Sequence, residues 1–208
     1  MKRFFTDSGF GLTKEAADRM GLIYIPHNIL YNGEPIEDVE GVILDEKHLK
    51  VAAPNAEQYR EAFEQFPNDE LIYITWSQGT KVTQTFDQIR ALKIPNLTMI
   101  DSGFFAEAQL EVVKRIMDNK PYDDIKHFFV VRNSSTGWIP IVKDKFCLFT
   151  MDNGQFKLLK TFDTKFAAVA QLKKHINTKL HYRKDMNSVI GLHAGAEYVG
   201  GMHIDKNI

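Results

Sequence analysis

Apolar positions follow two alternating patterns along residues 1–124. Short runs of β-branched and aromatic residues, typical of strands, occur at 2–6, 71–76 and 97–103. Between and after these runs, apolar residues recur every three or four positions, which predicts helices. The expected helices cover 14–20, 56–66, 80–92 and 104–119. Strand, loop and helix in regular succession favour a parallel sheet flanked by helices.

Turn and cap residues divide this part of the chain further. Pro26 interrupts an apolar run, which suits a bend or an edge strand. The Asn-Gly pair at 32–33 is typical of a hairpin turn. Asn55 is expected to begin a helix, with Gln58 in the capping-box position.

The pattern changes after residue 124. Strand-like segments separated by turn residues now dominate, and they lie at 127–133, 145–151, 155–162 and 197–204. The turn 151–154 joins two of them as a hairpin. A single helix, 164–176, is expected to be capped by Asp163. This part predicts an α+β arrangement with a mainly antiparallel sheet.

The expected fold class is therefore α/β with two domains. Residues 1–124 would form a parallel-sheet domain with flanking helices, and residues 125–208 a smaller α+β domain. The boundary between them falls in the polar segment near 120–126.

Composition narrows the classes of function. The 208 residues carry 44% hydrophobic and 25% charged residues, as an ordinary soluble protein does. A net charge of −1 gives no support for a nucleic-acid partner. No apolar run approaches the roughly 20 residues of a membrane helix. Cys147 is the one cysteine, which fits a reducing compartment. We expect a cytoplasmic protein without a membrane span.

Three similar loops follow the predicted parallel strands. They lie at 6–9, 76–80 and 100–103, and each supplies a hydroxyl, a glycine and backbone N–H groups near a helix start. Such loops at the carboxyl ends of parallel strands can hold an anion. Taken singly, each is also explained by ordinary helix capping. Their repetition favours a ligand site at this edge of the sheet.

Motifs for several other kinds of site are absent. Lys14 stands where a dinucleotide fingerprint needs its third glycine, and no phosphate-loop pattern occurs. The serine of the second loop, Ser77, lacks the preceding glycine of a nucleophile elbow. His193, His203 and Asp205 could meet at a metal, but their spacing is a weak signal. We predict no cofactor, no metal and no catalytic residue.

The ordered set of motifs resembles the DegV family of bacterial fatty-acid-binding proteins. The opening 4–38, the loop 77–83, the segment 100–103 and the closing 191–201 follow the family's order. The matching positions in the later motifs are Ser77, Gly79, Thr83, Asp101, Ser102, His193, Gly195 and Gly200.

The resemblance implies a non-catalytic protein that encloses a long-chain fatty acid between two domains and presents it to a separate kinase subunit. Two positions depart from the family pattern: Val51 replaces a head-group threonine, and Glu197 adds a negative charge nearby. The family's Gly-Gly-Arg-Ile-Ser segment is also missing. The implied lipid-binding residues are Ser77, Gln78, Gly79, His193 and Gly195, with Asp7, Ser8, Thr83, Asp101 and Ser102 behind them.

Two alternatives remain open. The chain could be an interaction or regulatory protein that kept the fold and lost the ligand. Side chains such as Phe104, Phe105 and Trp138 would then fill the space between the domains. It could also be an α/β enzyme acting on a small phosphorylated molecule. That enzyme would use Asp7, Ser8, Ser77 and Asp101.

Overall fold

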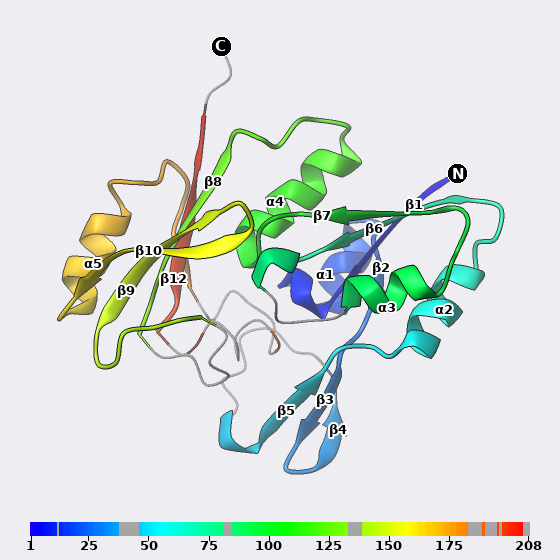
Figure 1. Cartoon of the computed structure of the whole chain (residues 1–208), viewed down its shortest axis with the longest axis horizontal. Helices are drawn as coiled ribbons and strands as arrows, with labels where there is room; N and C mark the ends of the chain where they lie inside the picture. Colours follow the sequence, from blue (N-terminus) through cyan, green and yellow to red (C-terminus); the bar gives the residue numbers. More distant parts are fainter. Residues whose placement is uncertain are drawn as a thin grey trace.

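The structure is a computed structural model of the chain. It describes residues 1–11, 13–37, 46–80, 85–132, 139–182, 189, 195 and 197–205. Figure 1 shows two main sheets side by side and a small third sheet that extends from them.

The first sheet, sheet A, is parallel throughout, as the sequence predicts. Its strand order is β2-β1-β6-β7. The strands are β1 (Lys2–Asp7), β2 (Ile23–Ile25), β6 (Glu70–Thr75) and β7 (Leu97–Asp101). All four strands point the same way, so their carboxyl ends share one edge.

Helices cover both faces of sheet A, because consecutive residues of its inner strands are apolar. On β6, Leu71 and Tyr73 pack on one face and Ile72 and Ile74 on the other. α2 (Ala56–Glu64) and α3 (Thr85–Ala91) cover the first face. α1 (Lys14–Arg19) and α4 (Ala106–Met117) cover the second.

The second sheet, sheet D, is antiparallel, as predicted for the second half. Its strand order is β10-β9-β8-β12-β11. The strands are β8 (Ile125–Val131), β9 (Phe146–Asp152), β10 (Gln155–Phe162), β11 (His181–Tyr182) and β12 (Val199–Ile204). α5 (Lys165–Leu172) packs on one face through Ala168 and Leu172. α4 packs on the other face through Ala108 and Val112.

The layers therefore run from α2 and α3 through sheet A, α1 and α4, and sheet D to α5 (Figure 1). α4 is shared, because it contacts both sheets. The division into domains 1–124 and 125–208 stays a prediction.

A third sheet, sheet B, was only partly expected. The Asn-Gly turn forms the β3–β4 hairpin, with φ of 53° at Asn32 and 88° at Gly33. β5 then pairs with β3, and no strand was predicted there. The bounds are β3 (Asn28–Tyr31), β4 (Glu34–Ile36) and β5 (Leu49–Ala52).

Two predicted caps have different outcomes. The capping box at the start of α2 is confirmed, since Asn55 Oδ1 accepts from Gln58 N at 3.0 Å and Gln58 Oε1 accepts from Asn55 N at 2.9 Å. The predicted cap of α5 is wrong by one residue. Thr164, not Asp163, accepts from the Ala167 N–H through its hydroxyl. Asp163 pairs with Lys145 instead.

Candidate functional site

The carboxyl edge of sheet A carries the predicted polar residues, and Asp7 is the most buried charge among them. Its Oδ1 accepts from Gly9 N at 2.8 Å. Its Oδ2 accepts from the hydroxyls of Tyr59, at 3.1 Å, and Tyr73. Burial, followed by the Asp7 charge, raises the pKa of both tyrosines well above the usual range. Asp7 therefore holds the sheet to α2, and its oxygens are occupied.

Ser8 is likewise bound internally. Its hydroxyl oxygen lies 2.8 Å from the Tyr24 hydroxyl, and it accepts from His27 N at 2.8 Å. These contacts tie the end of β1 to the segment that follows β2. Asp7 and Ser8 support the edge of the sheet rather than open toward a ligand.

Ser77, the central residue of the prediction, bridges the two main sheets. Its side chain is buried, with 1% of the residue exposed. Its hydroxyl donates to the carbonyl oxygen of Gly154 at 2.5 Å. Gly154 lies in the turn between β9 and β10, so the bond connects the edge of sheet A to a hairpin of sheet D.

Two glycines make this close approach possible. A Cβ atom on Gly79 would lie 2.7 Å from the Gly154 carbonyl oxygen, and one on Gly154 would lie 2.5 Å from the Ser77 hydroxyl. Gly154 also has φ of 73°. We call Ser77, Gly79 and Gly154 the junction.

The other predicted residues on this edge bond within and between the loops that follow β6 and β7. Gln78 donates from its side chain to Thr75 Oγ1 at 3.0 Å. Asp101 accepts from Gln78 N at 3.2 Å and from Gly103 N at 2.9 Å. The Ser102 hydroxyl bonds to the backbone of Phe104. The structure thus gathers Ser77, Gln78, Gly79, Asp101 and Ser102 at one place.

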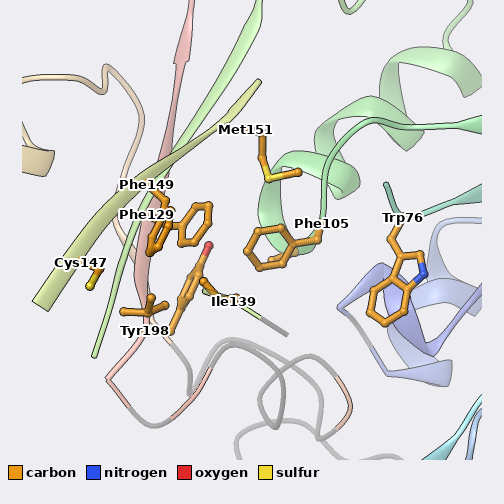
Figure 2. Close-up of a cluster of buried hydrophobic side chains, with 10 residues drawn as sticks. Trp76, Phe105, Phe129, Ile139, Cys147, Phe149, Met151 and Tyr198 are labelled. Atoms are coloured by element: carbon orange, nitrogen blue, oxygen red, sulfur yellow. The ribbon is translucent and has the colours of Figure 1, made fainter. Parts of the chain in front are cut away.

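Large aromatic side chains, among them Trp76 next to Ser77, form a buried cluster (Figure 2). Phe105 is fully buried, and its ring centroid lies 5.0 Å from that of Phe129 and 6.0 Å from that of Tyr198. Trp76, also buried, belongs to the same cluster from the side of sheet A. We call this set the aromatic cluster; its buried members are Trp76, Phe105, Ala106, Phe129, Val131, Ile139, Cys147, Phe149, Met151 and Tyr198.

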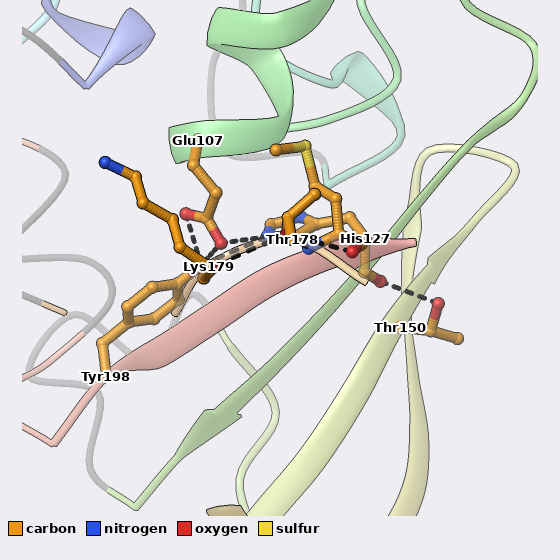
Figure 3. Close-up of polar contacts among 7 residues, drawn as sticks. Glu107, His127, Thr150, Thr178, Lys179 and Tyr198 are labelled. Carbon is orange, nitrogen blue, oxygen red and sulfur yellow. Dashed lines mark hydrogen bonds and ion pairs between the residues drawn. The ribbon is translucent and has the colours of Figure 1, made fainter. Parts of the chain in front are cut away.

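A buried polar group adjoins the aromatic cluster, and the sequence analysis missed it (Figure 3). The Tyr198 hydroxyl donates to the Glu107 carboxylate at 2.9 Å, and His127 Nε2 lies 3.0 Å from the same carboxylate. Burial, followed by the Glu107 charge, raises the pKa of Tyr198 well above its usual range. A Cβ on Gly200 would clash with the Glu107 carboxylate and the Tyr198 hydroxyl, so a larger residue there would displace this group. The group connects α4 to sheet D.

Several predictions involve residues that the structure does not describe. Thr83, Trp138 and His193 lie outside the described residues. Gly195 is described and buried, with φ of 81°. The distance from Ser77 to His193, on which the head-group prediction depends, is therefore not tested.

Glu197 and Val51, the two residues that depart from the family pattern, each contact identified residues of this chain. Glu197 pairs with Lys165 at 2.9 Å, which offsets its charge. Val51 packs in the apolar cluster of sheet B with Ile29 and Val189.

Neither a metal site nor a membrane-spanning helix is found among the described residues. His203 pairs with Asp205 at 3.1 Å, and no group of three metal-ligating side chains occurs among the described residues. Of the helices in the described part of the chain, none has the length and apolar character needed to cross a membrane.

Sequence comparison finds no match: no protein-family model matches the chain, and no curated protein does. Comparison of structures does find matches. A fatty-acid-binding DegV family protein from Streptococcus agalactiae has a TM-score of 0.70 at 15% identity, over 100% of this chain and 99% of that one.

Two further structures agree. A fatty-acid-binding DegV family protein from Thermus thermophilus has a TM-score of 0.69 at 14% identity, over 96% of this chain and 97% of that one. DegV from Bacillus subtilis, a fatty-acid-binding protein, has a TM-score of 0.67 at 16% identity, with the same coverage. Along its whole length, this chain has the fold of the DegV family proteins.

Proposed function

We propose that this chain binds a fatty acid or a similar acidic lipid and does not catalyse a reaction. The observation that carries the proposal is the full-length likeness to fatty-acid-binding DegV proteins, together with a hydroxyl–glycine loop at the meeting point of the two main sheets. A separate kinase subunit would be the partner that receives the lipid.

The head group is proposed to bind at the junction. In the structure, the Ser77 hydroxyl donates to a carbonyl oxygen, and a carboxylate oxygen offers the same kind of acceptor with a full charge. The lipid would therefore take the place of Gly154 and push the β9–β10 turn aside. Gln78 and Gly79 would border the head group, and His193 and Gly195 would contact it from the other side of the binding site.

The energetics favour a long chain over a short one. An acyl chain gains about 0.8 kcal/mol for each buried CH₂. Displacing the Ser77–Gly154 hydrogen bond costs about 1 kcal/mol. A tail also needs room, because the aromatic cluster is closely packed where it would lie. We expect the rings of Phe104 and Phe105 to shift when lipid enters.

Extraction of the purified protein tests the proposal. Organic extracts analysed by mass spectrometry should contain an acyl species, and added palmitate should raise the melting temperature of the stripped protein. Ser77→Ala should weaken palmitate binding about fivefold or more, the loss of one hydrogen bond to a charged group.

Thr98→Ala is the matched control. Thr98 lies on β7 of sheet A, is exposed, and is not among the predicted binding residues. This variant should bind palmitate as the parent does. No acyl species and no stabilisation by palmitate would overturn the proposal.

A second candidate function has one specific observation in its favour. The aromatic cluster fills space between the two main sheets with side chains that include Phe105, which was the sequence criterion for an interaction protein without a ligand. In that case the extraction is empty, and Ser77→Ala affects only stability. The enzyme alternative gains no support, since Asp7 and Ser8 are engaged in internal bonds.

A further inference from the structure

A separate cleft lies where the β3–β4 hairpin leaves the body of the molecule. Its volume is about 470 Å³, within the range of small-molecule sites. It lies beside the start of α1 and the end of β2, and none of the junction residues lines it, although the His27 ring centroid is 6.3 Å from that of Trp76, which precedes Ser77. Its apolar lining residues are Tyr24, Pro26, Ile29, Leu30, Pro35 and Ile36.

His27 is the polar residue that sets this cleft apart. It lines the cleft although only 8% of it is exposed, and its backbone N–H is fixed to Ser8 Oγ at 2.8 Å. Its Nδ1 is buried and has no hydrogen-bond partner among the described residues. A buried polar atom without a partner is costly, and few occur in native proteins.

The charges at the cleft argue against an acidic ligand. Lys14 is the cation of the lining, and its ammonium group already pairs with Asp18 at 2.6 Å. Glu15 and Glu37 add two carboxylates. Burial lowers the pKa of His27, so its ring is neutral near pH 7 and has one donor and one acceptor nitrogen.

We propose that this cleft is a binding site for a small uncharged molecule with an apolar body and one hydroxyl-type group, which hydrogen-bonds to the His27 ring. The apolar walls would shelter the body of the ligand. Because Nδ1 is buried in the structure, the ring would turn toward the cleft to make this bond. This site is independent of the proposed lipid site at the junction.

Binding of 4-ethylphenol, which is uncharged at pH 7.5, tests the site. We expect saturable binding with a Kd below about 1 mM. In NMR spectra, the imidazole nitrogens of His27 and the methyl groups of Ile29 and Ile36 should shift together. The anion 4-ethylbenzoate should bind at least tenfold more weakly.

Four variants locate the bound probe. Ile36→Trp and Pro35→Trp each fill the cleft at a partly exposed or exposed position and should abolish binding. His27→Phe keeps a ring but removes the hydrogen bond, and should weaken binding about fivefold. Ser77→Ala should leave it unchanged.

Several results would overturn the proposal. They are the absence of saturation, equal affinity for the anion, or full affinity in both tryptophan variants once their melting temperatures show that they fold. Palmitate binding that persists in the tryptophan variants, or that is lost on its own in Ser77→Ala, concerns the junction alone. The two sites can therefore fail separately.

Discussion

The loops after β6 and β2 share one edge of sheet A, and each contains a buried polar side chain. The side chain after β6 has a hydrogen-bond partner, whereas a ring nitrogen of the side chain after β2 has none among the described residues. Ser77, which follows β6, donates its hydroxyl to Gly154 across the interface of the two main sheets. His27, which follows β2, is nearly as buried, but its Nδ1 has no partner among the described residues. The sequence pattern indicated a site at the first loop and gave no signal at the second.

A buried polar group affects stability and ligand binding differently according to whether it already has a hydrogen-bond partner. A group whose partner is another part of the chain stabilises the fold, and a ligand must compete with that partner. A group without a partner lowers stability until something binds to it. The site proposed at the junction must therefore open before it binds a ligand, while the cleft proposed at His27 is already present and needs only a movement of the ring.

Phe105→Ala is expected to have the largest effect, and it tests how tightly the aromatic cluster beside the junction is packed. Phe105 is fully buried among the rings of Phe129, Phe156 and Tyr198. Its removal should lower the free energy of unfolding by about 3–5 kcal/mol, measured by urea denaturation. Phe166→Ala, at a position 85% exposed, is the control and should change it by less than about 0.5 kcal/mol. A small loss at Phe105 would mean that the interface is loosely packed and already open to a ligand.

Gly154→Ala tests the junction itself. The alanine Cβ would meet the Ser77 hydroxyl at 2.5 Å, at a φ of 73°. Gly33→Ala is a matched control, because Gly33 has φ of 88° but no atom within 4 Å of such a Cβ. We expect a loss of about 1 kcal/mol at Gly33 and roughly 2–3 kcal/mol at Gly154, by chemical denaturation. Equal losses would show that the two sheets are not held tightly at this point.

Much of the fold could be predicted from the sequence because local signals determined it. The apolar runs gave the strands of sheet A, and the Asn-Gly pair at 32–33 and the capping box at Asn55 gave a hairpin and a helix start. β5 was missed because its alternation of buried and exposed positions extends over only four residues, which is too short a run to stand out. The cap of α5 was assigned to Asp163 because two good capping residues stand next to each other there.

The site was harder to predict, because its contacts join distant parts of the chain. Ser77 and Gly154 are 77 positions apart, and neither loop contains a sign of the other. Glu107 lies on α4 between two buried alanines, where a sequence pattern cannot tell a buried carboxylate from a solvated one. His27 directly follows Pro26 in the sequence, but its burial depends on how the β3–β4 hairpin packs, which the local sequence does not indicate.

Ser77→Ala tests the hydrogen bond between Ser77 and Gly154 alone, and its expected effect on stability is smaller. It removes the hydroxyl that bonds to Gly154 without adding volume, so the free energy of unfolding should fall by about 1.5 kcal/mol. Added palmitate should restore less stability to this variant than to the parent, measured as the shift in melting temperature. A variant as stable as the parent would show that the hydroxyl is free to serve a ligand from the start.

The pH dependence of the free energy of unfolding tests whether the His27 ring is buried without a partner in the folded protein. Burial lowers the pKa of His27 in the folded state, and the nearby Asp7 charge only partly opposes this. The unfolded chain, with a histidine pKa near 6.5, then binds a proton that the folded chain does not, so stability falls as the pH drops below about 6.5. One proton limits this slope to about 1.4 kcal/mol per pH unit. In His27→Phe that component is absent, and denaturation at pH 7.5 and 5.5 should show a smaller loss than in the parent. Equal losses in the two proteins would mean that the ring is solvated or paired when folded, and the contrast between His27 and Ser77 would disappear.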